Sequence, residues 1–508
     1  MSVSYWNTNA HLPHYPKLDR DLDADVVVIG GGLTGLTTAY LLKRAGRRVV
    51  LLERGRLAGV DTNSTTAHLT CVVDLPPSSL IKTFGEDHAR AVWDAGMAAI
   101  SQIADTLDDE GVDANFKWVR GYLHAPVAAM EREDSQHMLQ QEAEAAAKLG
   151  FDARFVERAP FVDRPALEID HQARFDPVPY LKRMASVVDA DGSAIYEGTT
   201  VEEVESDPIV VKAGGHRINT GYVVIATHNP IVGKSTFLGA TLLQTKLALY
   251  TSYVVSGKVA PGRVPDALFW DTSDPYRYLR VDRCDGFDQV LYGGEDHKTG
   301  QAVDGASRFA ALESTLIRMV PDITLTHRWA GQVIETNDGL PFIGETSPKQ
   351  FVATGFSGNG TTFGTLAAMM ARDRVTGSAN PWAELFDTGR TKIVGGLWDY
   401  LKENKDYPYY LIRDRFAGPR DRSLRAVPRG TGKILELDGH RVAAYRHDDG
   451  EVTLLSPTCT HLGCQVEWNN TEHTWDCPCH GSRFLPTGEV LSGPAEKPMV
   501  PAKTGVRS

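Results

Sequence analysis

Four residues near the C-terminus combine the side chains that bind transition metals. One residue separates Cys459 from His461, and two residues separate Cys477 from His480. Thiolate sulfur and imidazole nitrogen are ligands for both zinc and iron. A structural zinc site is one interpretation, although a Cys-x-His pair is shorter than the spacing of common zinc motifs. A zinc site would also leave two further cysteines of this stretch unused.

The pattern also resembles a Rieske iron–sulfur site. In a Rieske centre one iron takes two thiolates and the other takes two imidazoles, which raises the reduction potential above that of an all-thiolate cluster. The resemblance implies a [2Fe-2S] cluster with four ligands: Cys459, His461, Cys477 and His480. It also implies a disulfide between Cys464 and Cys479, the extra pair found in Rieske proteins of the cytochrome bc complexes.

Three further features refine this resemblance. Ser482 stands where the family uses a hydroxyl to bond a cluster sulfide, and Gly493-Pro494-Ala495 resembles the proline loop that covers the cluster. Phe484 departs from the pattern, because proteins of the bc type commonly have a tyrosine there. Loss of that hydrogen bond lowers the potential, so we expect an intermediate value.

A second chemical motif lies near the N-terminus. A β-branched run at residues 24–29 leads into Gly30-Gly-Gly-Leu-Thr-Gly35, a helical pattern at 36–44 and a second strand at 48–52. Glu53 ends that strand, eighteen residues after Gly35. Glycines let the backbone approach a pyrophosphate at a helix N-terminus, and the acid bonds a ribose hydroxyl. The alternative, a glycine-rich turn that binds no nucleotide, does not explain this complete arrangement of elements.

Later segments resemble the D-amino-acid oxidase (DAO) family of FAD-dependent oxidoreductases. The resemblance covers about residues 20–385 and is carried by the stretches 199–204, 222–227, 329–331, 338–344 and 353–360, with a helix at 365–370. This resemblance implies FAD as the cofactor. No second strand–turn–helix nucleotide motif is present, so NAD(P)H has no evident site.

The resemblance and the motif together predict a set of FAD-binding residues. The expected residues are Gly30, Gly32, Leu33, Thr34, Gly35, Glu53, Arg54, Thr65, Thr66, Ala67, Val201, Ala226, Thr227, Gly331, Gly358, Asn359, Gly360 and Thr361. In some relatives the flavin is covalently attached, and His68 or Cys71 is a candidate for such a link.

Candidate catalytic residues lie in the substrate half. His68 follows the flavin segment, and alternation along a strand places Tyr276, Tyr278 and Arg280 on one face. If that face looks toward the flavin, Arg280 can clamp a substrate carboxylate. His297, in Glu295-Asp-His297, is a candidate base or polar wall. The alternatives are a structural histidine and a solvated arginine.

Length and composition limit the remaining possibilities. A chain of 508 residues is too long for one core, and the net charge of −12 argues against nucleic acid as a partner. The N-terminus shows no signal peptide, and no apolar run is long enough for a transmembrane helix. We therefore expect a cytoplasmic protein, a compartment in which a disulfide is unusual unless it is buried.

The predicted architecture is α/β, with a Rossmann-type FAD-binding domain, a mixed-sheet substrate domain of the DAO and glutathione-reductase type, and a small all-β Rieske domain. The expected boundaries are an arm at 1–22, the oxidoreductase at 23–385, a linker at 386–428 and the Rieske domain at 429–508. Helices are expected at 86–110 and 134–149. Between residues 390 and 430, ten Arg or Lys stand against five Asp or Glu, with a helix expected at 393–403. Such a linker packs between its acidic domains or binds an anionic partner.

Two such cofactors in one chain predict a converter from two-electron to one-electron transfer. The expected reaction is oxidation of a small amine or amino acid by FAD, with electrons passing through the cluster to an external acceptor such as a protein, a quinone or oxygen. The alternatives are an electron-transfer component that serves a partner enzyme such as an oxygenase, and a redox sensor whose cluster controls assembly.

Overall fold

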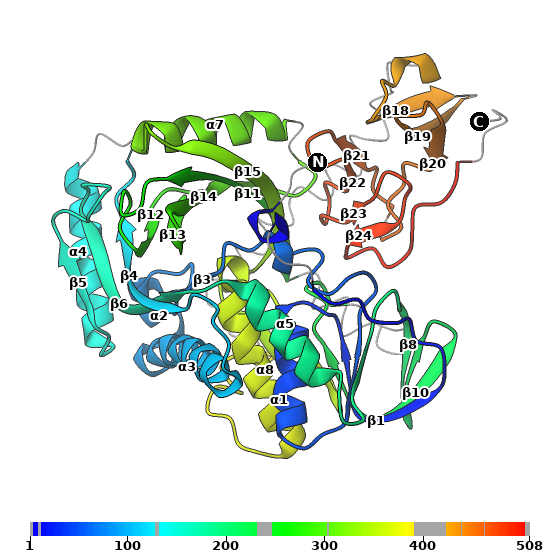
Figure 1. Cartoon of the computed structure of the whole chain (residues 1–508), viewed down its shortest axis with the longest axis horizontal. Coiled ribbons are helices and arrows are strands. Elements are labelled where there is room, and N and C mark those ends of the chain that lie inside the picture. Colours follow the sequence, from blue (N-terminus) through cyan, green and yellow to red (C-terminus); the bar gives the residue numbers. More distant parts are fainter. Residues whose placement is uncertain are drawn as a thin grey trace.

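The computed structural model describes residues 4–8, 12–127, 132–230, 246–301, 304–390, 423–437, 439–461 and 463–502. Two large mixed sheets and a group of helices form the body of the molecule, and two small sheets form a separate lobe at the C-terminal end (Figure 1). None of the helices in these ranges has the length and hydrophobicity to span a bilayer.

The first sheet is built around a parallel core of β-branched and leucine side chains. The expected strand at 24–29 is part of β1, whose Val26 lies opposite Val49 on one neighbour and Tyr222 on the other. All four residues of β2 are buried, as expected for a strand covered on both faces. The sheet runs in the order β16 (Phe342–Ser347), β17 (Gln350–Thr354), β10 (His216–Ile225), β1 (Leu22–Ile29), β2 (Val49–Leu52) and β7 (Ala194–Tyr196), with β9 (Ile209–Ala213) and β8 (Val201–Ser206) attached to β10.

The second sheet is the predicted substrate half, and most of its neighbouring strands are antiparallel. It runs in the order β15 (Thr324–Thr336), β11 (Leu247–Val259), β14 (Phe287–Lys298), β13 (Tyr278–Cys284), β12 (Ala267–Asp271), β4 (Lys117–His124), β6 (Ala166–Arg174) and β3 (His68–Leu69), with β5 (Ala153–Val156) paired to β6.

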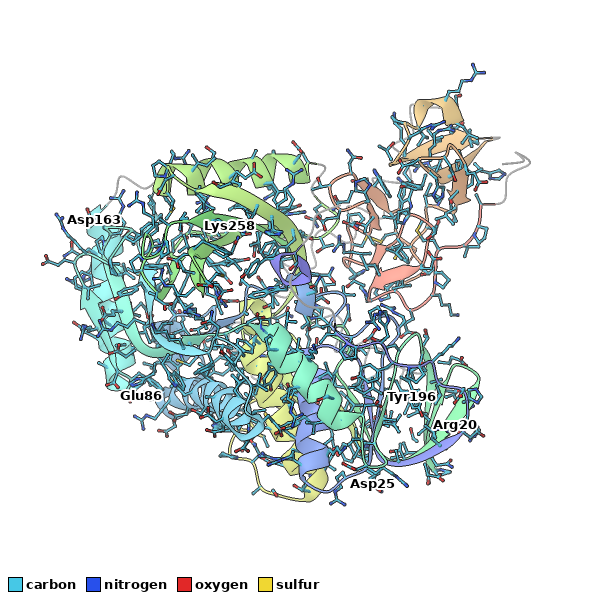
Figure 2. All side chains as sticks on the ribbon, in the orientation of Figure 1. Arg20, Asp25, Glu86, Asp163, Tyr196 and Lys258 are labelled. Atoms are coloured by element: carbon cyan, nitrogen blue, oxygen red, sulfur yellow. A yellow bond between two sulfur atoms is a disulfide. The ribbon has the colours of Figure 1, made fainter. Side chains whose placement is uncertain are left out.

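Helices pack on both sheets. The helix expected at 86–110 is confirmed as α3, and the one expected at 134–149 as α4 (Figure 1). Apolar side chains of α1 (Leu33–Arg44), α3 (Glu86–Glu110) and α8 (Gly360–Thr376) belong to the largest core cluster. The α7 helix (Gly305–Met319) packs on one face of the second sheet. Charged side chains such as those of Glu86 and Asp163 lie exposed on the periphery (Figure 2). The helices are α1 (Leu33–Arg44), α2 (Pro77–Phe84), α3 (Glu86–Glu110), α4 (Arg132–Lys148), α5 (Pro177–Val188), α7 (Gly305–Met319) and α8 (Gly360–Thr376).

The C-terminal lobe contains two antiparallel sheets. One is formed by β18 (Thr431–Leu437), β19 (His440–Arg446) and β20 (Val452–Leu455), and the other by β21 (Glu467–Asn469), β22 (Thr474–Asp476), β23 (Arg483–Phe484) and β24 (Val490–Ser492). The second of these sheets faces the body near β11 and β15 (Figure 1). Most of the predicted linker, including the helix expected at 393–403, lies outside the described residues.

Candidate functional site

The glycine-rich turn after β1 forms a cradle in which side chains cannot fit. A Cβ on Gly30 would lie 2.5 Å from the carbonyl oxygen of Ala226, and one on Gly35 would lie 1.8 Å from the carbonyl oxygen of Gly30. The α1 helix begins directly after this turn, with Gly32 at its N-cap. Its first amides and the positive end of its dipole therefore face the turn, as a bound pyrophosphate requires.

Glu53 lies at the end of β2 beside this cradle. Its carboxylate accepts hydrogen bonds from the backbone N–H groups of Gly31, at 2.7 Å, and Gly55, at 2.6 Å. Both Glu53 and Arg54 line the adjoining cavity. This arrangement fits the ribose end of a dinucleotide, as the sequence predicts.

A second segment, residues 62–68, begins beside this cradle, where Thr62 Oγ1 accepts a hydrogen bond of 3.0 Å from the N–H of Leu33, and it is held by Trp6 and by β15. The indole N–H of Trp6 donates to the carbonyl of Thr65 at 2.6 Å, and that of Trp329 donates to the carbonyl of Ser64 at 2.8 Å. A Cβ on Gly331 would lie 2.8 Å from the Cβ of Ser64. Residues of β15 therefore hold this segment closely.

One cavity of about 1160 Å³ joins the predicted FAD site, the substrate half and the C-terminal lobe. Most of the predicted FAD residues line it; Gly35 and Ala67 do not, because they support the cradle and the 62–68 segment from behind. The predicted FAD residues on its wall are Gly30, Gly32, Leu33, Thr34, Glu53, Arg54, Thr65, Thr66, Val201, Ala226, Thr227, Gly331, Gly358, Asn359, Gly360 and Thr361.

The part of this cavity enclosed by α4, β4, β11–β14 and residues 70–77 is called the substrate half of the cavity below. Apolar side chains of Leu123, Met138 and Trp270 form one side of it. Tyr278 and His68 line it as predicted, with ring centroids 5.6 Å apart. Tyr278 Oη shares a hydrogen bond of 2.9 Å with the Ser252 hydroxyl.

His68 is a neutral side chain within this wall. Its Nδ1 lies 3.0 Å from the Thr66 hydroxyl, and its Nε2 is buried with no hydrogen-bond partner among the described residues. Burial, with the nearby positive charge of Arg280, lowers the pKa of His68 to about 3. The neutral imidazole can therefore accept a proton or a hydrogen bond from a ligand in the cavity.

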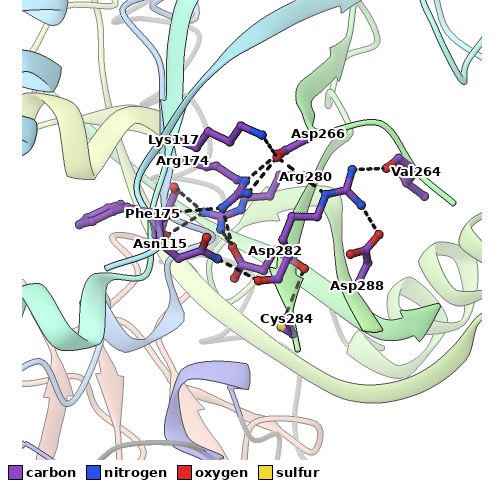
Figure 3. A network of polar contacts seen from close by, with 12 residues as sticks. Asn115, Lys117, Arg174, Phe175, Val264, Asp266, Arg280, Asp282, Cys284 and Asp288 are labelled. Atoms are coloured by element: carbon purple, nitrogen blue, oxygen red, sulfur yellow. Dashed lines mark hydrogen bonds and ion pairs between the residues drawn. The ribbon is translucent and has the colours of Figure 1, made fainter. Parts of the chain in front are cut away.

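The prediction that Arg280 clamps a substrate carboxylate is at odds with its position. The guanidinium donates from Nη1 to the carbonyls of Thr66 at 3.0 Å, Ala67 at 2.6 Å and Phe175 at 3.2 Å, and it pairs with Asp282 (Figure 3). The side chain is completely buried and does not line the cavity. Strand alternation placed Arg280 on the expected face, but the backbone of the 62–68 segment lies between that face and the cavity.

His297 is also placed away from the cavity. Its ring stacks on Tyr253, with centroids 5.7 Å apart, and burial lowers its pKa to about 4. Glu295 has a φ of 59°, and the pairing of β11 with β14 shifts register nearby, so simple alternation fails at this point. Asp296 lines the cavity in place of His297, and it was not among the site residues predicted from the sequence.

Cys71, the alternative flavin attachment point, is buried beneath the site. Its backbone N–H donates to Gln172 at 3.1 Å, and the thiol does not line the cavity. Burial raises its pKa to about 12, so the thiol stays protonated and unreactive.

The four predicted cluster ligands form two pairs in the C-terminal lobe, Cys459 beside Cys477 and His461 beside His480. Cys459 and Cys477 are buried and lie in no disulfide, and the rings of His461 and His480 have centroids 5.0 Å apart at an interplanar angle of 85°. Burial lowers the pKa of both histidines to about 4, which keeps them in the neutral form that binds metal. Nδ1 of His461 is buried and has no hydrogen-bond partner in the described part of the chain.

Cys464 and Cys479 form a disulfide that joins the two ligand loops. Their sulfur atoms and that of Cys477 lie within 4.8 Å of one another, so the disulfide lies beside a predicted cluster ligand. The Ser482 hydroxyl accepts a hydrogen bond of 3.0 Å from the N–H of Ala495, which ties the predicted proline loop to the second ligand loop.

The lobe touches the cavity at several points. His461 and residues 491–497 line the cavity, and Nη2 of Arg54 donates to the carbonyl of Leu491 at 3.0 Å. Gln332 on β15 donates to the carbonyl of Gly481 at 2.9 Å and accepts from the Ser492 hydroxyl. No sequence pattern indicates this bridge, because a single glutamine in a strand has many structural roles.

Comparisons with known proteins agree with both halves of this site. Residues 25–374 match the model of the FAD dependent oxidoreductase family DAO, and residues 421–504 match that of the Rieske [2Fe-2S] domain. The chain is 34% identical over 503 residues to YhfW of Bacillus subtilis (strain 168), described as a Rieske 2Fe-2S iron-sulfur protein, with 98% of this chain and 96% of that one covered.

Two more distant proteins resemble only the oxidoreductase part. Gamma-glutamylputrescine oxidoreductase of Escherichia coli (strain K12) is 22% identical over 423 residues, covering 80% of this chain and 97% of the relative. The crystal structure of glycine oxidase from Geobacillus kaustophilus superimposes with a TM-score of 0.59 at 19% identity, covering 73% of this chain and 99% of that structure. The chain therefore belongs to the DAO family of FAD-dependent oxidoreductases and carries a C-terminal Rieske domain, with FAD and a [2Fe-2S] cluster as its cofactors.

Proposed function

We propose that this protein oxidises a C–N bond of a small amine or amino acid at FAD and passes the electrons through the Rieske cluster to an external acceptor. The observation that supports this proposal is the single cavity, which is lined by the FAD cradle, by the substrate half and by the cluster ligand His461. When bound, FAD accepts two electrons at once and the cluster transfers them one at a time.

The chain's own residues hold the cluster and couple it to the body. In this proposal Cys459, His461, Cys477 and His480 are the ligands, and the disulfide keeps their two loops together. Gln332 fixes the second ligand loop against β15, one residue from Gly331 of the predicted flavin site. Electron transfer within one chain requires that the two redox centres lie close together.

The substrate half of the cavity supplies positioning and a dry environment. Amine oxidation needs a neutral nitrogen and a C–H bond held over the flavin, away from bulk water. The apolar side formed by Leu123, Met138 and Trp270 excludes water, and His68 and Tyr278 offer hydrogen-bonding groups. The amine and amino-acid substrates in the names of the two distant relatives support this reaction class.

An anaerobic titration of the purified holoprotein with amines and amino acids tests the proposal. We expect flavin bleaching followed by the EPR signal of the reduced cluster. Reduction only by a partner protein would support the electron-transfer component instead, and a redox-dependent change of association without turnover would support the sensor. If Cys459→Ser preserves full turnover with oxygen and yields stoichiometric peroxide, the cluster is not the required route.

A further inference from the structure

The substrate half of the cavity is an acidic compartment. Its wall carries the carboxylates of Asp74, Glu142, Asp271 and Asp296, and none of its described residues is a lysine or an arginine. The basic residues that do line the cavity, Arg54, Arg56 and Lys497, lie at the nucleotide end and on the C-terminal lobe.

The arginines nearest to this compartment are committed to other contacts. Arg280 is held by three carbonyls and Asp282, behind the 62–68 segment. Arg277 pairs with Glu295 at 2.7 Å, and Arg308 donates to the carbonyl of Glu295 at 2.8 Å. Within the described ranges, a substrate carboxylate therefore finds no cation to pair with in this half.

Two of the four carboxylates are already used within the protein. Glu142 accepts hydrogen bonds from the N–H and the hydroxyl of Ser78, and Asp271 accepts from the N–H groups of Ser273 and Arg277. They fix local structure. Asp74 also accepts hydrogen bonds from the protein, but its side chain is exposed, and Asp296 bonds Ser252 while its Oδ1 has no partner among the described residues, so these two carboxylates remain within reach of a ligand.

Asp296 is the group that most directly indicates a ligand. It lines the cavity and is almost enclosed by protein, yet its Oδ1 is buried and has no hydrogen-bond partner in the described part of the chain. Burial raises its pKa to about 7; Asp74 and Glu295 add to this effect, while Ser252 and Arg308 oppose it. A buried oxygen without a partner is costly unless a ligand or water satisfies it.

Asp74 lies close enough for its charge to act on Asp296. Its Oδ2 accepts a hydrogen bond of 3.4 Å from the N–H of Gly358, and Tyr276 also bonds it. Its side chain is exposed to the cavity. The two carboxylates, with Tyr276 close to both and Tyr278 close to Asp296, form a surface suited to an ammonium group.

The geometry points to a substrate that is an organic cation without a carboxylate: an amine with a second, positively charged nitrogen. The reacting nitrogen must be neutral, so the acidic pair binds the second nitrogen and orients the first toward the flavin. A carboxylate in the same place would meet like charges. This inference rests on the proposed function and narrows its substrate class.

Binding of two unreactive ligands to the holoprotein tests the inference without turnover. Propyltrimethylammonium has no lone pair on nitrogen, and 4,4-dimethylpentanoate has a similar shape with a carboxylate. We expect the cation to perturb the flavin spectrum with a Kd at least about 10-fold lower than that of the anion. Equal or tighter binding of the anion would overturn the inference.

Charge-removing variants locate the binding site. Asp296→Asn and Asp74→Asn should each weaken binding of propyltrimethylammonium by about 10-fold or more, because each removes one negative charge that attracts the cation. Glu144→Gln, on the exposed side of α4, removes the same charge and should leave the Kd unchanged. An equal effect of all three variants would assign the preference to net charge and reject the site. The comparison of the two ligands on the unaltered protein needs no variant to fold.

Matched substrates separate this inference from the proposed function. Anaerobic flavin reduction by 1,5-diaminopentane should exceed that by lysine, which differs by one carboxylate. Faster reduction by lysine would reject the acidic-site inference and leave amine oxidation intact. If no amine or amino acid reduces the flavin while the cation still binds at Asp296, the proposed function fails and the binding site stands.

Discussion

At Arg280 one guanidinium group holds together carbonyls of Thr66, Ala67 and Phe175 and the carboxylate of Asp282. The carbonyls belong to the 62–68 segment and to the end of β6, which are distant in the chain. At the residue scale, this arginine therefore fixes the shape of the flavin site from behind, and its substitution should affect folding before it affects substrate binding.

We expect Arg280→Met to destabilise the protein by about 3–5 kcal/mol, because it removes the guanidinium paired with buried Asp282 and leaves only the more distant Arg174, at 3.9 Å, to offset that charge. The double variant Arg280→Met/Asp282→Asn should recover part of this loss. Urea unfolding followed by flavin fluorescence measures both. A variant of normal stability whose substrate KM alone rises would instead indicate a direct substrate clamp.

Asp296 gives a pH-dependent prediction. Its raised pKa means that the folded protein binds this proton more tightly than the unfolded chain does. The resulting stabilisation is complete below the unfolded pKa of 3.8 and is lost as pH rises through about 7. Asp296→Asn has no such loss. The free energy of unfolding of this variant, relative to that of the unaltered protein, should therefore be higher at pH 8 than at pH 5, by roughly 1 to 2 kcal/mol after solvent screening.

Thermal unfolding of the FAD-loaded protein at the two pH values measures this difference. Glu144→Gln is the matched control, since it lies on the outer side of the cavity-lining helix α4. A pH profile of Asp296→Asn that parallels that of the unaltered protein would contradict the assignment.

Single residues were predictable where chemistry restricts their spacing. The cysteine and histidine pairs can be read from the sequence because few other sites need Cys-x-His and Cys-x-x-His together. Asp296 could not be selected, because its place on the wall depends on the irregular backbone at Glu295. The prediction for Arg280 was wrong because strand alternation shows which face of the sheet a side chain lies on, and does not show which segment covers that face.

At the scale of elements, β15 connects the two redox domains. Trp329 and Gly331 on this strand contact Ser64 of the 62–68 segment, and Gln332 reaches Gly481 and Ser492 of the cluster lobe. One strand thus touches both sites within three residues. The sequence predicted a mixed sheet in the substrate half, but no local pattern indicates a bridge between domains.

Gln332→Leu should loosen the cluster lobe, because it leaves a buried carbonyl and a buried hydroxyl without partners, at a cost of about 1–3 kcal/mol. We expect faster hydrogen exchange in residues 477–482 and slower reduction of the cluster after the flavin. Gln350→Leu is the control, since Gln350 donates to Ser206 at 3.2 Å within the first sheet. Unchanged exchange in Gln332→Leu would show that the bridge does not hold the lobe.

At the scale of the whole molecule, contact between body and lobe depends on close backbone approach. A Cβ on Gly300, after β14, would lie 2.5 Å from the carbonyl carbon of Cys477. Domain order was predictable from sequence, because each domain has its own motif. Their mutual placement was not, because it rests on contacts between residues that are far apart in the chain.

Gly300→Ala should displace the lobe and slow electron transfer from flavin to cluster, with the ultraviolet–visible spectra of both cofactors retained. Gly262→Ala is a close control: Gly262 has a φ of 78° against 80° for Gly300, and a Cβ there meets no atom within 4 Å. Both variants carry a similar backbone strain of about 1–2 kcal/mol. Stopped-flow reduction of the two proteins should therefore differ only through the interface, and equal rates would argue against it.

The segment 491–497 lies along the nucleotide end of the cavity, with Arg54 bonded to Leu491. We expect this segment to hinder release of a dinucleotide bound at that end of the cavity. During biosynthesis the N-terminal domain emerges from the ribosome first, so we expect FAD to be loaded before the last domain folds over it. The iron–sulfur domain should then slow the release of FAD. Chains truncated before residue 423 should therefore release FAD faster on dilution than the full-length protein.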